Sequence, residues 1–293
     1  MKAIGLDIGG TAVKYALIDS NMTIIDKAKI STRNKRPEII VEEISSLIRQ
    51  RCFDWKDIPV GVCCAGEVDP LTGSVTADNL GWVNVSLGKM FKQALGFLPV
   101  FSQDAAAAMY AEKVFGALQG EKSAIFMTIG TGIGGDILIQ GDSYRDSHPN
   151  GFEIGHMITH ANGDQCPCGE RGCYERYASA SALSRMTHNM YSAKDIAKGA
   201  EAGDSVFLDI WNRYIQEICI GLVNLLAVFM PDKIVIGGGL SACGEFLLSS
   251  ILREMQNHAY YVRYGNNLQI CLSQFGNDAG VIGAAKVAME KGK

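Results

Sequence analysis

The sequence predicts an α/β protein with two lobes, and two observations indicate it. A strand, a turn rich in glycine and threonine, and a second strand occur at residues 4–18 and again at residues 125–139. Around them, short apolar runs typical of strands alternate with amphipathic or alanine-rich runs typical of helices. A supersecondary unit that occurs twice suggests one copy in each half of a bilobal protein.

The first half begins as a meander. We expect strands at residues 2–8, 13–19 and 22–30, a helix at 37–50, strands at 58–64 and 100–101, and an alanine-rich helix over 104–112. Pro37 is a typical first residue of a helix. Residues 65–66 and 69–73 carry loop signals, and residues 79–82 lie in a segment with no clear period.

The second half alternates in the same way. We expect strands at residues 123–129 and 137–140, helices at 178–202 and 205–230, a strand at 233–236, a helix at 243–257, a strand at 268–272 and a helix at 278–289. Pro231 ends the second of these helices.

Composition and charge exclude several classes of protein. Hydrophobic residues make up 47% of the 293 positions, which is enough for one large or two ordinary cores. A net charge of −4 without a long Lys/Arg run predicts no binding of nucleic acid or of an anionic membrane. The longest apolar run, 218–230, is too short to span a bilayer. Nine cysteines without a secretory signal favour a reducing compartment, so we expect the cytoplasm.

A group of metal-binding side chains lies within eighteen positions, namely His156, Cys166, Cys168 and Cys173. One imidazole and three thiolates form a complete tetrahedral set for Zn²⁺. The alternative, three buried free thiols beside a core histidine, fits poorly with so polar and glycine-rich a run. Four protein ligands leave no open position on the metal, so we expect a structural zinc that also holds the flanking Glu153 and Glu175 in a fixed relation.

Three glycine-rich turns each follow a strand, at residues 9–11, 130–135 and 237–239. Backbone N–H groups in such turns converge on phosphate oxygens. Neither a Walker A sequence nor the dinucleotide-binding pattern is present, because no turn ends in Gly-Lys-Ser/Thr and the first turn begins a hairpin. One such turn is usually structural, but three, with Thr11, Thr131 and Lys14 close by, favour a nucleoside triphosphate.

Two carboxylates near these turns have alternative roles. Asp104 precedes an alanine-rich helix and could be its N-cap, or it could take the proton from an attacking hydroxyl. Asp7 could be an ordinary carboxylate at the end of a strand, or it could face the phosphates and hold Mg²⁺ through water.

Seven motifs together resemble a known family. They are Asp7-Ile-Gly-Gly-Thr11, Gln103-Asp-Ala105, Ile129-Gly-Thr-Gly-Ile-Gly-Gly135, Glu153-Ile-Gly-His156, Cys166-Pro-Cys168-Gly-Glu-Arg-Gly-Cys173-Tyr-Glu175, Ile236-Gly-Gly-Gly239 and Gly276-Asn-Asp-Ala-Gly280. In this order and spacing, over the full length of the chain, they resemble the ROK family of bacterial sugar kinases and sugar-responsive repressors, which belongs to the actin, hexokinase and Hsp70 superfamily.

The resemblance implies a two-lobed RNase H-like (actin-like) fold with a cleft between the lobes and a Cys₃His zinc loop. The N-terminal lobe would comprise residues 1–118 plus 276–293, with the first phosphate turn and the catalytic aspartate. The C-terminal lobe, residues 119–275, would carry the second phosphate turn, the zinc loop and the wall against adenosine. A homodimer or homotetramer is implied as well.

The implied activity is transfer of the γ-phosphoryl of ATP, bound with Mg²⁺, to the 6-hydroxyl of a hexose, with glucose as the default. Asp104 would be the catalytic base. The sugar would be bound by Gly66, Asn79, Gln103, Asp104, Glu153, His156 and Glu175, and His156 would hold zinc through its other nitrogen. ATP would be bound by Asp7, Gly9, Gly10, Thr11, Lys14, Thr131, Gly132, Gly237, Gly238 and Gly239.

The chain departs from the family pattern at three positions near these sites. Gln103 and Ala106 stand where the family has asparagine, and Asp136 stands where it has glycine. The glutamine amide reaches one methylene further, so the sugar could be shifted or different, and N-acetylmannosamine or another hexose remains an alternative to glucose. A carboxylate at 136 facing the phosphates would weaken ATP binding, so it could instead point away.

Two other classes are considered. A sugar-sensing repressor needs a DNA-binding domain, and with Asp7 six residues from Met1 we expect no room for a helix-turn-helix before the first turn. A non-catalytic sugar-binding or regulatory ROK protein would follow if the three departures had disabled the site, and it would bind sugar without releasing ADP.

Overall fold

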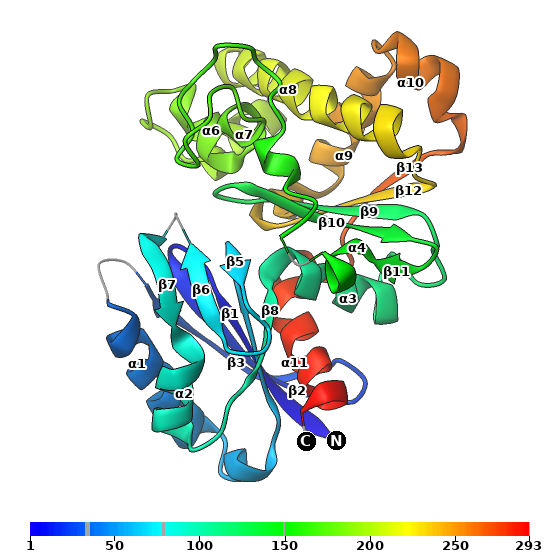
Figure 1. Cartoon of the computed structure of the whole chain (residues 1–293). Helices are drawn as coiled ribbons and strands as arrows, with labels where there is room; N and C mark the ends of the chain where they lie inside the picture. Colours follow the sequence, from blue (N-terminus) through cyan, green and yellow to red (C-terminus); the bar gives the residue numbers. More distant parts are fainter. Residues whose placement is uncertain (33–35, 78–79, 149, 293) are drawn as a thin grey trace. The chain divides into compact units, whose positions relative to one another are not determined.

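Figure 1 shows the computed structural model, which describes residues 1–32, 36–77, 80–148 and 150–292. The chain divides into two compact units. The first comprises Met1–Gly116, His148–Asn150 and Asp278–Lys293, and the second comprises Ala117–Ser147 and Gly151–Asn277. Each unit is built around its own five-stranded sheet. Every helix in the described part of the chain falls short of the length or the hydropathy that crossing a bilayer requires.

The sheet of the first unit has the order β3-β2-β1-β4-β8. Its strands are β1 (Lys2–Ile8), β2 (Ala12–Asp19), β3 (Ile24–Ser31), β4 (Val60–Cys64) and β8 (Val100–Gln103). The first three form an antiparallel meander, and β4 and β8 run parallel to β1. Ile8 pairs with Cys64 and Cys64 with Gln103, so the three parallel strands end level with one another. The segments after them therefore emerge at one edge of the sheet, where ligands of open α/β sheets usually bind.

The last helix of the chain covers this sheet. The helices of the first unit are α1 (Pro37–Arg51), α2 (Leu87–Leu95), α3 (Asp104–Phe115) and α11 (Ala279–Lys291), with the 3₁₀ turn η1 (Trp55–Asp57). α11 packs against β1, β4 and α3. A Cβ atom on Gly5 would lie 2.0 Å from the carbonyl oxygen of Val281, and one on Gly61 would lie 1.9 Å from that of Ala284. Glycine at these two positions lets the helix backbone rest directly on the strands.

A small antiparallel sheet, β5-β6-β7, is inserted between β4 and α2. Its strands are β5 (Glu67–Val68), β6 (Ser74–Ala77) and β7 (Trp82–Ser86). Val75 and Ala77 of β6 are buried, and so is Trp82 of β7. Strands of two to five residues are too short to establish a period, so this sheet could not be predicted from the sequence.

The sheet of the second unit has the equivalent order, β11-β10-β9-β12-β13. Its strands are β9 (Ala124–Ile129), β10 (Ile133–Ile139), β11 (Asp142–Ser143), β12 (Lys233–Gly237) and β13 (Gln269–Leu272). Again three strands form an antiparallel meander and two run parallel to the first. Residues 11–18 and 131–138 even share one succession of exposed, half-buried and buried positions. The repeat of one supersecondary unit in each half is thus confirmed.

Helices surround the second sheet. They are α4 (Tyr144–Ser147), α5 (Glu175–Ala178), α6 (Ala180–Arg185), α7 (Ala193–Glu201), α8 (Ser205–Phe229), α9 (Gly244–Met255) and α10 (Ala259–Tyr264), with the 3₁₀ turns η3 (Ile154–His156), η4 (Gly239–Cys243), η5 (Gly265–Asn267) and η6 (Gly276–Asp278). The side chain of Asp204 caps α8 by accepting from two backbone N–H groups. α8 buries Trp211 and Tyr214 in the core of the second unit, so it supports the segments that pack on this side of the sheet.

The expectation of one helix over residues 178–202 is wrong. α6 ends at Arg185, and His188 and Asn189 take left-handed conformations with φ of 52° and 61°. α7 is a new helix with a capping box at its N-terminus, in which the side chains of Ser192 and Asp195 bond to each other's backbone N–H groups. Ser192 and Asp195 were the signal in the sequence for this new start.

Candidate active site

The first glycine turn joins β1 to β2 and is held by two hydrogen bonds from Thr32. The backbone N–H of Thr32 donates to the carbonyl of Thr11 at 3.2 Å, and its hydroxyl donates to the carbonyl of Gly9 at 3.0 Å. Across the β1–β2 ladder, Lys14 Nζ lies 2.8 Å from Asp7 Oδ2. Burial by itself lowers the pKa of Lys14, but the charge of Asp7 and its hydrogen bond outweigh burial and the pKa is raised. Lys14 therefore stays cationic beside the turn.

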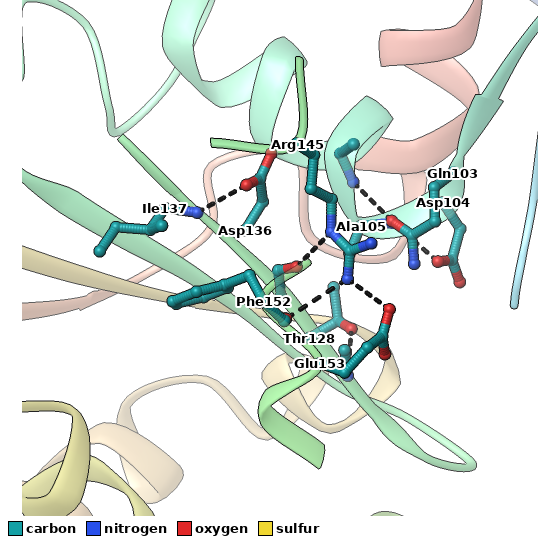
Figure 2. Close-up of polar contacts among 12 residues, drawn as sticks. Gln103, Asp104, Ala105, Thr128, Asp136, Ile137, Arg145, Phe152 and Glu153 are labelled. Carbon is teal, nitrogen blue, oxygen red and sulfur yellow. Dashed lines mark hydrogen bonds and ion pairs between the residues drawn. The ribbon is translucent and has the colours of Figure 1, made fainter. Parts of the chain in front are cut away.

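Gln103, rather than Asp104, caps the helix that follows β8. Gln103 Oε1 accepts from the backbone N–H of Ala106 at 2.9 Å (Figure 2). Asp104 is the first helical residue, and its Oδ1 accepts from the N–H of Ala105 at 2.7 Å. The N-cap alternative for Asp104 is therefore wrong. The Gln103 amide NH₂, unlike its oxygen, is not used for capping, so it can donate to a ligand.

The second glycine turn joins β9 to β10 and contacts Glu175. A Cβ atom on Gly132 would lie 2.5 Å from Glu175 Oε2, so glycine leaves room for this carboxylate. The same oxygen accepts from the N–H of Ile133 at 3.3 Å. On its other side, Glu175 Oε1 accepts from Cys166 Sγ at 3.6 Å. Glu175 thus connects the second turn to the cysteine loop.

The histidine and three cysteines converge as a group. Ligand atoms of His156, Cys166, Cys168 and Cys173 all lie within 4.8 Å of one another. Cys166 Sγ is 3.9 Å from His156 Nδ1, and Cys168 Sγ is 3.6 Å from Cys173 Sγ. Tetrahedral Zn²⁺ with bonds of about 2.3 Å separates its donors by about 3.7 Å, so the donor set fits this metal in both chemistry and spacing.

Backbone contacts support the loop that carries these ligands. Gly172 has φ of 80°, and a Cβ atom there would lie 1.7 Å from the carbonyl oxygen of His160. The ring of Tyr174, next to the last cysteine, packs on Gly221 of α8, and its hydroxyl donates to the carbonyl of Ile218 at 2.8 Å. Burial raises the pKa of the Cys173 thiol, so a cation is needed to hold it as a thiolate.

Arg145 is a residue of this region that the sequence reasoning missed. It lies in α4, its side chain is 4% exposed, and its Nη2 lies 2.7 Å from Glu153 Oε1 (Figure 2). A single arginine in Ser-Tyr-Arg-Asp-Ser gave no signal of this contact, because the pairing depends on how the chain turns between α4 and η3.

Asp136 points into the second unit, away from solvent. Its exposure is 0%, and its carboxylate accepts from the Ser143 hydroxyl at 2.5 Å and from the Ile137 N–H at 2.8 Å. Burial raises its pKa, against these hydrogen bonds and the charge of Arg145. The sequence left two orientations open for the Asp136 carboxylate, facing the phosphates or pointing away, and the structure has it buried and pointing away.

The remaining predicted site residues lie in turns. Gly10 is in the first turn, Thr131 is exposed in the second, and Gly237–Gly239 run from the end of β12 into η4. Gly238 has φ of 80°, and a Cβ atom there would lie 2.6 Å from the carbonyl oxygen of Ile129. Gly66, with φ of 89°, follows β4. Asn79 lies outside the described residues.

Two equivalent sheets, each with a glycine turn after its first strand, and a Cys₃His loop define a two-lobed α/β protein of the actin-like class. The chain belongs to the ROK family, whose model matches residues 3–291.

Relatives with different roles are similar to this chain. A glucokinase of Streptomyces coelicolor is 30% identical over 309 residues, covering 98% of this chain and 97% of that protein. A xylose repressor of Bacillus spizizenii is 30% identical over 297 residues, covering 98% of this chain and 77% of the repressor. The crystal structure of a ROK family glucokinase from Streptomyces griseus in complex with glucose and AMPPNP matches with a TM-score of 0.89 and 30% identity, covering 99% of this chain and 100% of that one.

Proposed function

We propose that this chain is an ATP-dependent hexose kinase that phosphorylates the 6-hydroxyl of its sugar, with glucose as the default substrate. The strongest support is the full-length likeness to a glucokinase that was crystallised with glucose and AMPPNP. Asp104 adds to it, because Gln103 caps α3 and the aspartate is not needed for that role.

In the proposed reaction, Asp104 accepts the proton of the sugar 6-hydroxyl as the oxygen attacks the γ-phosphorus. The new O–P bond forms in line with the bond to the β-phosphate oxygen, which breaks and releases ADP. Backbone N–H groups of the turns at residues 9–11 and 130–132, with Lys14, stabilise the charge on the phosphates. Asp7 would hold Mg²⁺ through water, and the ion, bound with ATP, would neutralise charge on the phosphate oxygens.

For sugar binding we propose Gly66, Asn79, Gln103, Glu153, His156 and Glu175. Zn²⁺, held by His156, Cys166, Cys168 and Cys173, acts as a structural ion that fixes the loop and gives no catalytic step. The orientation of the His156 ring, and hence of the nitrogen that faces the sugar, follows from this ligation. We further propose a cytoplasmic homodimer or homotetramer, which light scattering after size exclusion would test.

The experiment is ADP release with Mg²⁺-ATP against glucose, N-acetylmannosamine, N-acetylglucosamine, mannose, allose and fructose, on protein with one zinc per chain. Turnover above the sugar-free rate on one hexose supports the kinase and identifies its substrate. If no hexose is turned over but one still raises the melting temperature, the proposal fails. The chain would then be a non-catalytic sugar-binding protein, a role compatible with its likeness to a repressor.

A further inference from the structure

Arg145 is fixed in the second unit by contacts from two directions. Its Nε donates to the carbonyl of Gly135 in β10 at 3.1 Å, and its Nη2 donates to the carbonyl of Phe152 at 3.3 Å (Figure 2). Phe152 has the left-handed φ of 60°, and its ring packs edge-on against Phe229 of α8 with centroids 5.4 Å apart. A guanidinium group bound on both sides while 4% exposed has one orientation available.

The guanidinium group needs negative charge to offset its burial, and Glu153 supplies it at hydrogen-bonding distance. Arg145 Nη2 donates to Glu153 Oε1 at 2.7 Å. The start of α4, from which the Arg145 side chain extends, is held by Asp136, which is completely buried and accepts from the Ser143 hydroxyl and the Ile137 N–H. A buried cation that is fixed in this way orients the carboxylate that pairs with it.

Glu153 is the exposed partner of this pair. Its side chain is 41% exposed, and an ion pair with such a group adds little to the stability of the fold. The Arg145–Glu153 pair instead holds one oxygen of the Glu153 carboxylate in place. Oε1 faces Arg145, and among the described residues Oε2 has no hydrogen-bonding partner, so it is the oxygen that can accept from a ligand hydroxyl.

We infer that Arg145 is a positioning residue for Glu153, and that Asp136, where the family pattern has glycine, positions Arg145. This inference rests on the proposed function, because it assigns Glu153 to the hexose. Arg145 holds the exposed carboxylate in one orientation before the sugar arrives, which lowers the entropy lost on binding. Substitutions at 136 and 145 therefore act on hexose affinity, through Glu153, and not on the phosphate turns.

The test is a double-mutant cycle on zinc-loaded full-length protein, with hexose Kd from calorimetry and KM for hexose and ATP from ADP release. Arg145→Met weakens hexose binding about tenfold and Asp136→Asn by a smaller factor, while KM for ATP changes less than about twofold. In a Glu153→Gln background, Arg145→Met has no further effect on hexose binding. Arg213→Met is the matched control, because Arg213 forms an exposed surface pair with Asp209, 3.0 Å away.

Two results of the double-mutant cycle would overturn the inference. One is an equal loss of hexose affinity from Arg145→Met with and without the Glu153 substitution. The other is a parallel rise of both KM values, which marks a general loss of structure. If Arg145→Met does not fold, Arg145→Lys and Asp136→Asn replace it in the same double-mutant cycle. If the wild-type protein neither binds nor phosphorylates a hexose, the proposed function fails, and the inference fails with it. Wild-type activity that Arg145→Met leaves unchanged rejects the inference alone.

Discussion

The amide oxygen of Gln103 caps α3, and Asp104 is consequently the first residue inside the helix. Asp104 Oδ1 accepts from the N–H of Ala105 in the first turn of this helix. Capping of α3 and the proposed acceptance of the hydroxyl proton therefore belong to two different residues, and one aspartate does not have to serve both. Gln103 begins the helix, and Asp104 is not needed for the cap.

Asp104→Asn should lower kcat by about 10²-fold or more, because an amide cannot take the hydroxyl proton. Its side-chain oxygen can still accept from Ala105, so the helix should form and hexose Kd should change less than about threefold. Steady-state kinetics together with calorimetry check this. Full activity of the variant would refute the role of Asp104 as the base.

Gln103→Asn should keep the cap, since asparagine is a preferred N-cap residue, and the melting temperature should not fall. The shorter side chain withdraws the amide NH₂ by one methylene. We therefore expect the ratio of kcat/KM for glucose and N-acetylmannosamine to change by about tenfold. An unchanged ratio would mean that Gln103 acts only as a cap and does not contact the sugar.

Loss of zinc should damage sugar binding and spare nucleotide binding. Cys168→Ser removes one exposed ligand with little change in packing, so zinc affinity should fall and hexose binding should weaken about tenfold or more. ATP analogue affinity should change less than about twofold. Cys243→Ser, outside the cluster, is the control. Wild-type hexose affinity in zinc-free Cys168→Ser protein would contradict the proposed link.

Asp195 should give the start of α7 a pH dependence. The Ser192 hydroxyl and backbone N–H both bond to its carboxylate, and they lower its pKa below the ordinary 3.8. The folded state therefore binds fewer protons than the unfolded state, so this contribution to stability is present above about pH 4 and is lost as pH falls through the lowered pKa. The difference in melting temperature between wild type and Asp195→Asn should shrink from pH 6 to pH 3. A difference that stays constant or grows would exclude the mechanism.

The sequence predicted the two sheets because local rules decide them. Residues 2–8 and 124–129 are nearly continuous apolar runs, most of whose residues are buried, and a glycine turn follows each of them. This signal lies in consecutive residues and needs no knowledge of distant contacts. The Cys₃His loop was predictable for the same reason, since its ligands lie close together in the chain and their chemistry is specific.

The missed features depend on packing. Residues 178–202 have helical composition throughout, but two left-handed residues break the helix between Arg185 and Ala193. Asp104 has the commoner residue type for a cap, yet the turn after β8 gives that position to Gln103. The pairing of Arg145 with Glu153 depends on a bend between two short helical segments, which no period in the sequence records.

The return of α11 to the first sheet has a consequence for synthesis on the ribosome. The strands of the first sheet are translated by residue 103, but the helix that rests on Gly5 and Gly61 begins only at Ala279. The second unit, whose sheet and helices all lie between residues 124 and 272, can be completed while the first sheet still exposes its apolar face. The first sheet therefore lacks the helix that covers it until Ala279–Lys291 has been synthesised.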